Sequence, residues 1–81
     1  IDILVHSIAY ANPETFAQPI SGVSQAHFAE ALVTSSYSVL PLVRKARPRL
    51  TRGASVMTMT YLGGQRVVAN YKLMGVAKAA L

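Results

Sequence analysis

The sequence contains no cysteine and no tryptophan, and only three of its 81 residues are acidic. Without cysteine, neither a disulfide framework nor a thiolate metal site can form within these residues. No apolar run reaches the roughly 18 residues that a membrane-spanning helix needs, so we expect no membrane span. The two histidines and the three carboxylates show no spacing typical of metal ligands, and we therefore expect no bound metal.

Basic residues outnumber acidic ones by eight to three, and the formal net charge is +5. Within nine consecutive positions the chain carries Arg44, Lys45, Arg47, Arg49 and Arg52. A cluster of this kind can bind nucleic acid. No aromatic residue lies among these cations, however, and cations also complement the carbonyl dipoles at the end of a helix. We favour a solvated helix end and expect no nucleic-acid partner.

Apolar residues are abundant, at 52% of the chain against 14% charged residues. A chain of this length forms at most one small domain with a marginal core. The sequence opens at Ile1 on an apolar run and closes at Leu81 inside a helical pattern. We therefore expect residues 1–81 to be an excerpt from a single larger domain, whose other strands and helices would cover much of this apolar surface.

Strand-like and helix-like patterns alternate along the chain. The β-branched run Ile1–Ala9 predicts a strand buried on both faces, and Ala54–Tyr61 predicts a second strand. Between them, residues 24–47 carry apolar side chains at three- and four-residue steps, which predicts a long helix. Pro41 predicts a kink in this helix, and Pro48 predicts its end at about the preceding residue.

The segments that follow the two predicted strands are long loops, over residues 10–22 and 62–70, and a second helix is predicted from Tyr71 onward. A strand, a helix and a strand form a βαβ unit, whose crossover should be right-handed. The predicted fold class is therefore α/β, as part of a Rossmann-type, doubly wound parallel sheet that is incomplete within 81 residues. Ligands of such sheets bind at the carboxyl ends of the strands, so we expect the site beside these two loops.

Tyr71 and Lys78 are the candidate chemical pair. Seven residues correspond to about 700° of helix, close to two full turns, so both would share one face if Tyr71 begins the helix. A cation beside a phenol favours phenolate and improves the hydroxyl as a proton donor. Tyr61, at the end of the second strand, would point into the same crevice. By themselves, a tyrosine and a lysine at this spacing are more often a surface pair than a chemical one. We interpret Gly63 and Gly64 as a tight turn, not a phosphate-binding loop.

Three stretches of the chain resemble one known family. They are DILVHSIAYA (residues 2–11), SSYSVL (residues 35–40) and, above all, TMTYLGGQRVVANYKLMGVAKAAL (residues 58–81). These stretches are similar to the bacterial NADH-dependent enoyl-acyl-carrier-protein reductases of the short-chain dehydrogenase/reductase superfamily. Six residues between Tyr71 and Lys78, with the additional Tyr61 upstream, are typical of this branch. Most short-chain dehydrogenases place the lysine four residues after the tyrosine.

The resemblance implies an oxidoreductase that reduces the trans-2 double bond of enoyl thioesters on acyl carrier protein, in type II fatty acid biosynthesis. The hydride from NADH would add to the β carbon, and a hydroxyl donor would stabilise the charge that develops on the thioester oxygen. The resemblance also implies a cytoplasmic bacterial homotetramer that triclosan targets. The preference for NADH over NADPH is a family property that no residue of this segment specifies.

The same resemblance implies roles for individual residues. Tyr71 would hydrogen-bond the thioester carbonyl, Tyr61 would line the same site, and Lys78 would hold the nicotinamide ribose. The implied cofactor-binding residues are Ser7, Ile8, Ala9, Met59, Thr60 and Lys78. The implied substrate-binding residues are Ala11 and Met74. The chain departs from the family pattern in having Ala69 where proline is frequent and Lys72 where asparagine is frequent.

Two alternatives remain open. The first is a carbonyl-reducing short-chain dehydrogenase, against which the long tyrosine-to-lysine spacing argues. The second is a catalytically inactive fragment or interaction module of the same fold. A piece with two strands and no cofactor loop is expected neither to bind NADH nor to turn over, so the isolated fragment would be inactive. Assays with crotonyl and acetoacetyl thioesters would separate the first alternative from the reductase.

Overall fold

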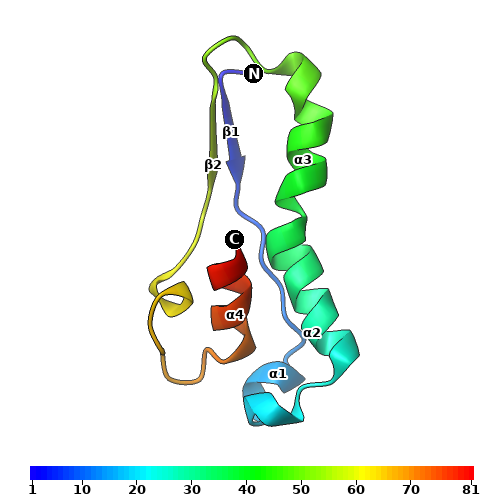
Figure 1. The fold of residues 1–81 in the computed structure, drawn as a ribbon, viewed down its shortest axis with the longest axis vertical. Coiled ribbons are helices and arrows are strands. Elements are labelled where there is room, and N and C mark those ends of the chain that lie inside the picture. The colour runs from blue at the N-terminus through cyan, green and yellow to red at the C-terminus, as the bar shows by residue number, and fades with distance from the viewer.

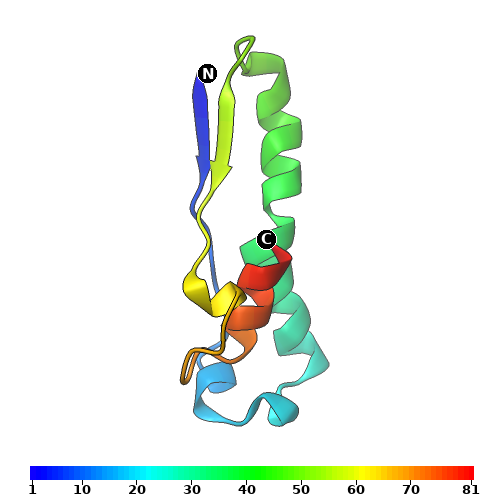
Figure 2. The same cartoon turned by 60° about the vertical axis from the view of Figure 1, so that its left-hand side comes forward.

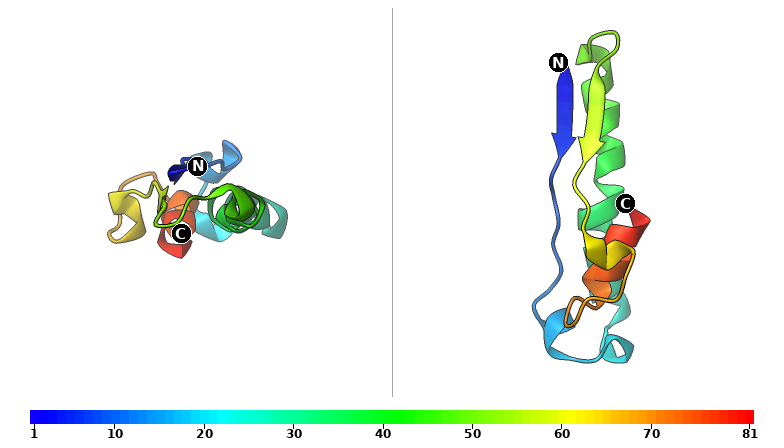
Figure 3. Two further views of the ribbon diagram at one scale, coloured as in Figure 1. Left: turned by 90° about the horizontal axis from the view of Figure 1, so that it is seen from above. Right: turned by 90° about the vertical axis from the view of Figure 1, so that its left-hand side faces the viewer.

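The computed structural model describes residues 1–81 and consists of a two-stranded parallel sheet with helices along one side (Figure 1). Strands β1 (Ile3–His6) and β2 (Ser55–Thr58) pair in parallel over their full lengths. The helical segments between them run back along the sheet, antiparallel to both strands (Figure 3). The molecule is elongated, with extents of 45 × 24 × 15 Å. The predicted strand–helix–strand unit and its parallel sheet are therefore confirmed.

Strand β1 is shorter than the predicted strand Ile1–Ala9, and only one of its faces is covered. Leu4 is half-buried and His6 is buried on the face toward the helices. Ile3 and Val5 point the other way and are 61% and 48% exposed. The prediction of a strand buried on both faces is thus wrong for these 81 residues. An apolar outer face is the pattern of a sheet that further elements cover.

The segment after β1 is not the structureless loop predicted for residues 10–22. It contains helix α1 (Glu14–Ala17) and a 3₁₀ turn, Ile20–Gly22. The main-chain oxygen of Asn12 accepts a hydrogen bond of 2.7 Å from the Thr15 hydroxyl, and Thr15 is only 1% exposed. Pro13, a residue typical of loops, occupies the N-cap position of α1. Prolines are well tolerated where a helix begins, because the missing N–H has no helical partner there.

The long helix predicted for residues 24–47 is present as a nearly continuous rod. It comprises α2 (Gln25–Leu32), a π-helical turn (Val33–Tyr37) and α3 (Val39–Ala46), followed by a 3₁₀ turn. Ser24 caps α2, since its hydroxyl accepts a 3.1 Å hydrogen bond from a first-turn backbone N–H. The α-helix ends two residues before Pro48, close to the predicted end.

The irregularity in this rod lies upstream of the predicted position. The sequence predicts a kink at Pro41, whereas the structure has the π turn, closed by a 3.0 Å bond from the Ser38 N–H to the Val33 carbonyl. Proline has no N–H to give to the carbonyl of Tyr37 and its ring crowds that carbonyl. The wider π turn absorbs this mismatch one turn earlier.

A buried histidine fastens the sheet to the rod. His6 is 1% exposed, and its Nδ1 and Nε2 atoms lie 2.8 Å from the Thr58 hydroxyl and 2.7 Å from the Ser38 hydroxyl. Ser38 donates its single proton to the carbonyl of Thr34, at 2.6 Å. The Ser38 oxygen can then accept a hydrogen bond from Nε2 of His6, while the Thr58 hydroxyl lies close to Nδ1 and, at 3.3 Å, to the main-chain oxygen of His6. One side chain thus joins both strands and the helical rod.

The core lies between the rod and helix α4 (Leu73–Ala80), beyond the strand ends (Figure 2). The buried core residues are Ala11, Ala31, Leu73, Met74 and Ala77. Ser35, in the π turn, is 0% exposed. Its hydroxyl accepts a 2.9 Å hydrogen bond from the Tyr10 N–H and donates one of 3.0 Å to the Tyr10 carbonyl oxygen. The small Ser35 side chain therefore lets the segment that leaves β1 pack closely against the rod. No helix here combines the length and apolar character needed to cross a membrane.

Candidate active site

The carboxyl ends of the two strands open onto the same edge of the sheet. The chain leaves β1 through Ser7, Ile8 and Ala9, and leaves β2 through Met59 and Thr60. All five residues are exposed. The structure therefore brings the predicted cofactor-binding residues of both strands together on one open ledge, as the topology of a parallel sheet requires.

Tyr61 and Tyr71 form a pair beside this ledge. Their ring centroids are 4.9 Å apart and the ring planes are inclined by 60°. Such tilted contacts are favourable arrangements of aromatic rings. Tyr61 follows the end of β2, and Tyr71 lies in the turn just before α4. The sequence predicts both phenols in one crevice, and the structure places them side by side.

Gly63 makes room for this pair. It lies in the 3₁₀ turn Leu62–Gly64, where an added Cβ would overlap the ring of Tyr71 and come within 3.2 Å of Tyr61. Neither of these contacts involves a flexible chain end, so any larger residue must displace a ring. The sequence predicts a turn at this glycine but not its contact with the rings. Its position between two tyrosines was the available signal for a packing role.

Helix α4 is anchored to the end of β2 near Lys78. The Lys78 ammonium donates to the Met59 carbonyl at 3.0 Å, and the Thr60 hydroxyl donates to the Lys78 carbonyl at 3.2 Å. At Gly64, an added Cβ would lie 3.0 Å from the backbone of α4, at Lys78 and at Ala79. Small residues and main-chain acceptors therefore hold this helix against the segment that leaves the strand.

Tyr71 and Lys78 do not lie as their spacing predicted. The helix begins at Leu73, and Tyr71 precedes it in a turn between two residues with positive φ, Asn70 at 65° and Lys72 at 49°. No hydrogen bond joins Tyr71 to Lys78, whose ammonium binds the end of the strand instead. The prediction that the two residues share one helical face is thus wrong, because Tyr71 precedes the helix and positive φ angles before Leu73 break the regular helical spacing.

The pKa of Tyr71 moves opposite to the prediction. Burial disfavours the charged phenolate and, with a smaller contribution from neighbouring Tyr61, raises the pKa of Tyr71 above 10.0. The hydroxyl therefore stays protonated throughout the neutral range. It can serve as a hydrogen-bond donor to an oxygen on which negative charge develops, without any help from an adjacent ammonium in this structure.

The two predicted substrate-binding residues lie deeper than the ledge. Ala11 and Met74 are 9% and 5% exposed and belong to the core cluster between α4 and the rod. The Met74 sulfur lies 3.9 Å from the buried hydroxyl of Ser35. In this structure both side chains support the floor beneath the tyrosine turn, and their contact with an acyl chain stays a prediction.

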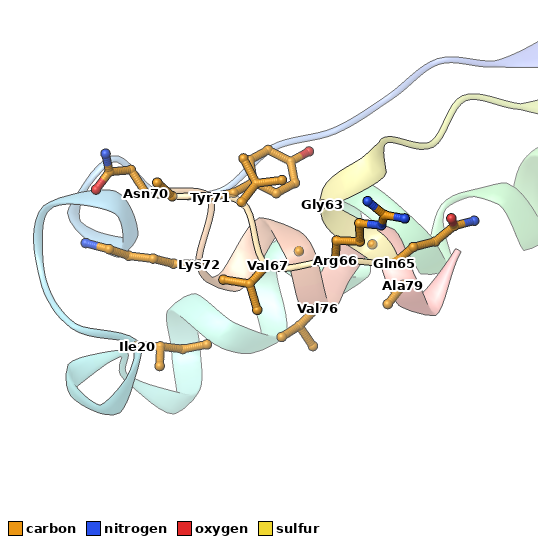
Figure 4. A pocket seen from close by; sticks show the side chains of 14 residues that line it. Ile20, Gly63, Gln65, Arg66, Val67, Asn70, Tyr71, Lys72, Val76 and Ala79 are labelled. Atoms are coloured by element: carbon orange, nitrogen blue, oxygen red, sulfur yellow. The ribbon is translucent and has the colours of Figure 1, made fainter.

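A cavity of about 590 Å³ lies on the other flank of the tyrosine turn. Residues 63–72 and the exposed side of α4 form most of its wall, and Ile20 closes one end (Figure 4). Tyr71 is the only predicted catalytic residue that lines it. Figure 4 shows the Tyr71 ring turned away from the side chains of Asn70 and Lys72. The cavity thus adjoins the site through a single shared residue.

Comparison with known proteins shows similarity along the whole chain. A family model described as Enoyl-(Acyl carrier protein) reductase matches residues 1–81. The chain is 47% identical over 81 residues to the protein named Enoyl-[acyl-carrier-protein] reductase [NADH] FabI of Nostoc sp.. This alignment covers all of the chain but 31% of that relative.

Solved structures agree with this similarity. The crystal structure of the enoyl-[acyl-carrier-protein] reductase (NADH) of Aquifex aeolicus superposes with a TM-score of 0.94 at 41% identity, over 100% of this chain and 35% of that one. The reductase of Anaplasma phagocytophilum, solved in complex with NAD, gives a TM-score of 0.93 at 34% identity, over 100% and 31%. The 81 residues thus span about a third of these relatives and form part of a Rossmann-type fold.

Proposed function

Because this chain belongs to the enoyl-(acyl carrier protein) reductase family, we propose that the protein it comes from reduces the trans-2 double bond of enoyl thioesters carried on acyl carrier protein. One observation carries the proposal: a protonated, partly buried tyrosine, paired with a second tyrosine, stands at the carboxyl end of a parallel strand. Residues 1–81 would be the central portion of a single dinucleotide-binding domain, and the reaction would belong to fatty acid biosynthesis.

The ledge at the strand ends fits NADH, which would supply the hydride when bound. Ser7, Ile8 and Ala9 on one strand end and Met59 and Thr60 on the other are exposed, and their apolar members offer a surface for flat rings. The ammonium of Lys78 reaches the Met59 carbonyl at this edge. Its two remaining protons can be donated to ribose hydroxyls. We therefore propose these residues for cofactor binding.

Tyr71 would donate its hydroxyl proton to a hydrogen bond with the thioester oxygen. That oxygen gains negative charge as the β carbon accepts hydride, so the hydrogen bond is stronger in the transition state than in the ground state. The raised pKa keeps the donor protonated. Tyr61, whose ring contacts that of Tyr71, would hold the donor in place and line the site.

The assembled state and cellular setting are further parts of the proposal. The rod carries a row of large apolar side chains that are exposed by 43–55%, namely Phe28, Val33, Tyr37 and Leu40. A homotetramer that buries such residues between subunits would remove them from water. A cytoplasmic bacterial enzyme that triclosan inhibits is expected from the family. Sedimentation of the full-length protein would test the assembly.

The central experiment uses the full-length protein with crotonyl thioester and NADH, following the absorbance of NADH. We expect turnover in the unaltered protein and a loss of about a hundredfold or more in Tyr71→Phe, since removal of one such donor costs roughly two to three orders of magnitude. Cofactor binding should persist in the variant. Undiminished turnover would contradict the role of Tyr71, and reduction of acetoacetyl thioester instead would indicate a carbonyl reductase.

A further inference from the structure

Lys72 ties the turn that carries Tyr71 to the segment after β1. Its ammonium donates to the carbonyl of Phe16 at 2.7 Å and to the carbonyl of Gln18 at 3.0 Å, although these residues lie 56 and 54 positions away in the chain. Phe16 is in the single turn of α1 and Gln18 is its C-cap. Figure 4 shows the Lys72 side chain extended toward this ribbon. An ammonium is a favourable partner for carbonyls at the end of a helix.

The backbone of Lys72 is held in a conformation that suits glycine. Its φ is 49° and its ψ is −122°, and the Tyr71 carbonyl accepts a 3.1 Å hydrogen bond from the Met74 N–H across it. This is the geometry of a turn that contains a residue with positive φ, where glycine is preferred. A residue other than glycine keeps such a strained backbone conformation only when neighbouring contacts stabilise it. The two carbonyl contacts of the ammonium are the surroundings that the structure provides.

The tethered segment, residues 12–20, borders the site at both of its ends. Ala11 stands just before it in the core beneath the tyrosine turn. Ile20 ends it and lines the same cavity as Tyr71 and Lys72. The tether at Phe16 and Gln18 therefore holds the middle of a segment whose two ends adjoin the tyrosine turn.

We propose that Lys72 is a positioning residue that holds the segment 12–20 against the turn of Tyr71 and thereby sets the space for the acyl chain beside the reacting thioester. The kinetic part of this proposal rests on the proposed function. Lys72 does not need to touch substrate, because two of its three ammonium protons are already donated to carbonyls. Its effect would pass through the backbone of the segment.

Three variants of the full-length protein separate the tether from the strained backbone. Lys72→Met removes the ammonium and keeps a side chain, Lys72→Gly removes both the ammonium and the strain, and Lys72→Arg keeps a cation of similar reach. Lys45→Met is the control, since this lysine is exposed on α3 and makes no polar contact. The readouts are hydrogen exchange of residues 14–22, KM and kcat for enoyl thioesters of two chain lengths, and NADH affinity.

We expect faster exchange of residues 14–22 in both Lys72→Met and Lys72→Gly, with near-normal exchange in Lys72→Arg and Lys45→Met. KM for the longer enoyl thioester should rise about tenfold in the first two variants, equivalent to losing one charge-assisted contact. The value of kcat and the affinity for NADH should change less than about twofold. Lys72→Gly should regain thermal stability relative to Lys72→Met, because glycine relieves the positive φ.

Unchanged exchange in Lys72→Met would overturn the tether. Normal exchange and normal KM in Lys72→Gly would equally overturn it, since the lysine would then serve only the turn. Faster exchange with an unchanged KM would overturn the link to the acyl chain. If the unaltered protein reduced no enoyl thioester, the proposed function would fail, while hydrogen exchange would still decide whether Lys72 holds the segment.

Discussion

Replacing Gly63 by alanine is the sharpest test of how the site is held together. An added Cβ would overlap the ring of Tyr71 and would stand 3.2 Å from the ring of Tyr61. The two rings already touch, with centroids 4.9 Å apart, so Tyr71 has little space in which to retreat toward its partner. We expect Gly63→Ala to push the phenol of Tyr71 outward from its position beside the strand end.

The magnitude follows from the kind of contact. Forcing one extra carbon into a packed site typically costs about 1–3 kcal/mol of stability. Moving a catalytic group by about 1 Å can cost roughly a hundredfold in rate. If the proposed function holds, Gly63→Ala should therefore lower kcat of the full-length protein by about ten- to a hundredfold, with a loss of about 1–3 kcal/mol in the free energy of unfolding.

The chain offers a matched control at Gly53. This glycine has a φ of 79°, but no atom lies within 4 Å of an added Cβ. Gly53→Ala should thus lose about 1 kcal/mol to backbone strain and keep full turnover. The assay is NADH oxidation with crotonyl thioester, alongside chemical unfolding of each variant. A stability loss in both variants with a rate loss only in Gly63→Ala would isolate the displacement of the tyrosine.

A double-mutant cycle separates the packing of the ring from the placement of its hydroxyl. In a Tyr71→Phe background the ring remains but the hydroxyl is gone, so Gly63→Ala should still destabilise the protein and should reduce the residual rate no further. Normal kcat in Gly63→Ala, or a rate loss that is equally large with and without the Tyr71 hydroxyl, would refute the view that Gly63 acts by placing this donor.

Three further outcomes are expected in the full-length protein. Folding favours the neutral phenol of Tyr71, because the pKa of this residue is raised above 10.0. Its contribution to stability is therefore complete below about pH 10 and is lost as the pH rises through the raised pKa. Ultraviolet titration should show one tyrosine that ionises late, and Tyr71→Phe should remove that transition. Lys78→Met should weaken NADH binding several-fold in a fluorescence titration, whereas equal affinity would contradict its ribose role. His6→Phe removes the imidazole that the hydroxyls of Thr58 and Ser38 contact, and it should lower the free energy of unfolding in denaturant by about 1–3 kcal/mol. A change below about 0.5 kcal/mol, the lower end for one hydrogen bond, would contradict the role of His6 in joining the sheet to the rod.

The strands and the long helix could be predicted from the apolar periodicity of the sequence and from the residues that begin and end helices. β-branched runs marked both strands, and Ser24 and Pro48 marked the beginning and end of the helical rod to within two residues. The sequence did not reveal the π turn, because Pro41 acts on hydrogen bonds one turn upstream. It also did not reveal α1, since Pro13 is equally typical of a loop and of a helix start.

The predictable part of the site came from the topology. Parallel strands place their carboxyl ends at one edge, so the ledge and the tyrosine pair could be expected from the order of the elements alone. The relative placement of Tyr71 and Lys78 could not be predicted from their spacing. Helical spacing assumes regular helical backbone, whereas Asn70 and Lys72 have positive φ. The need for glycine at position 63 comes from its contact with the rings of Tyr71 and Tyr61 across the turn. No periodic pattern in the sequence indicates this contact.

Contacts among these residues already hold Tyr71 in place. Gly63 and Gly64 let α4 approach the end of β2, Lys78 binds a main-chain oxygen there, and Lys72 holds the segment behind the turn. The outer face of the sheet is left uncovered. Hydrogen bonds and close packing therefore fix the proposed donor locally, whereas the proposed cofactor and acyl chain would need walls from other residues. Residues 1–81, which span about a third of the relatives they match, can therefore carry a formed tyrosine turn and only part of the proposed site.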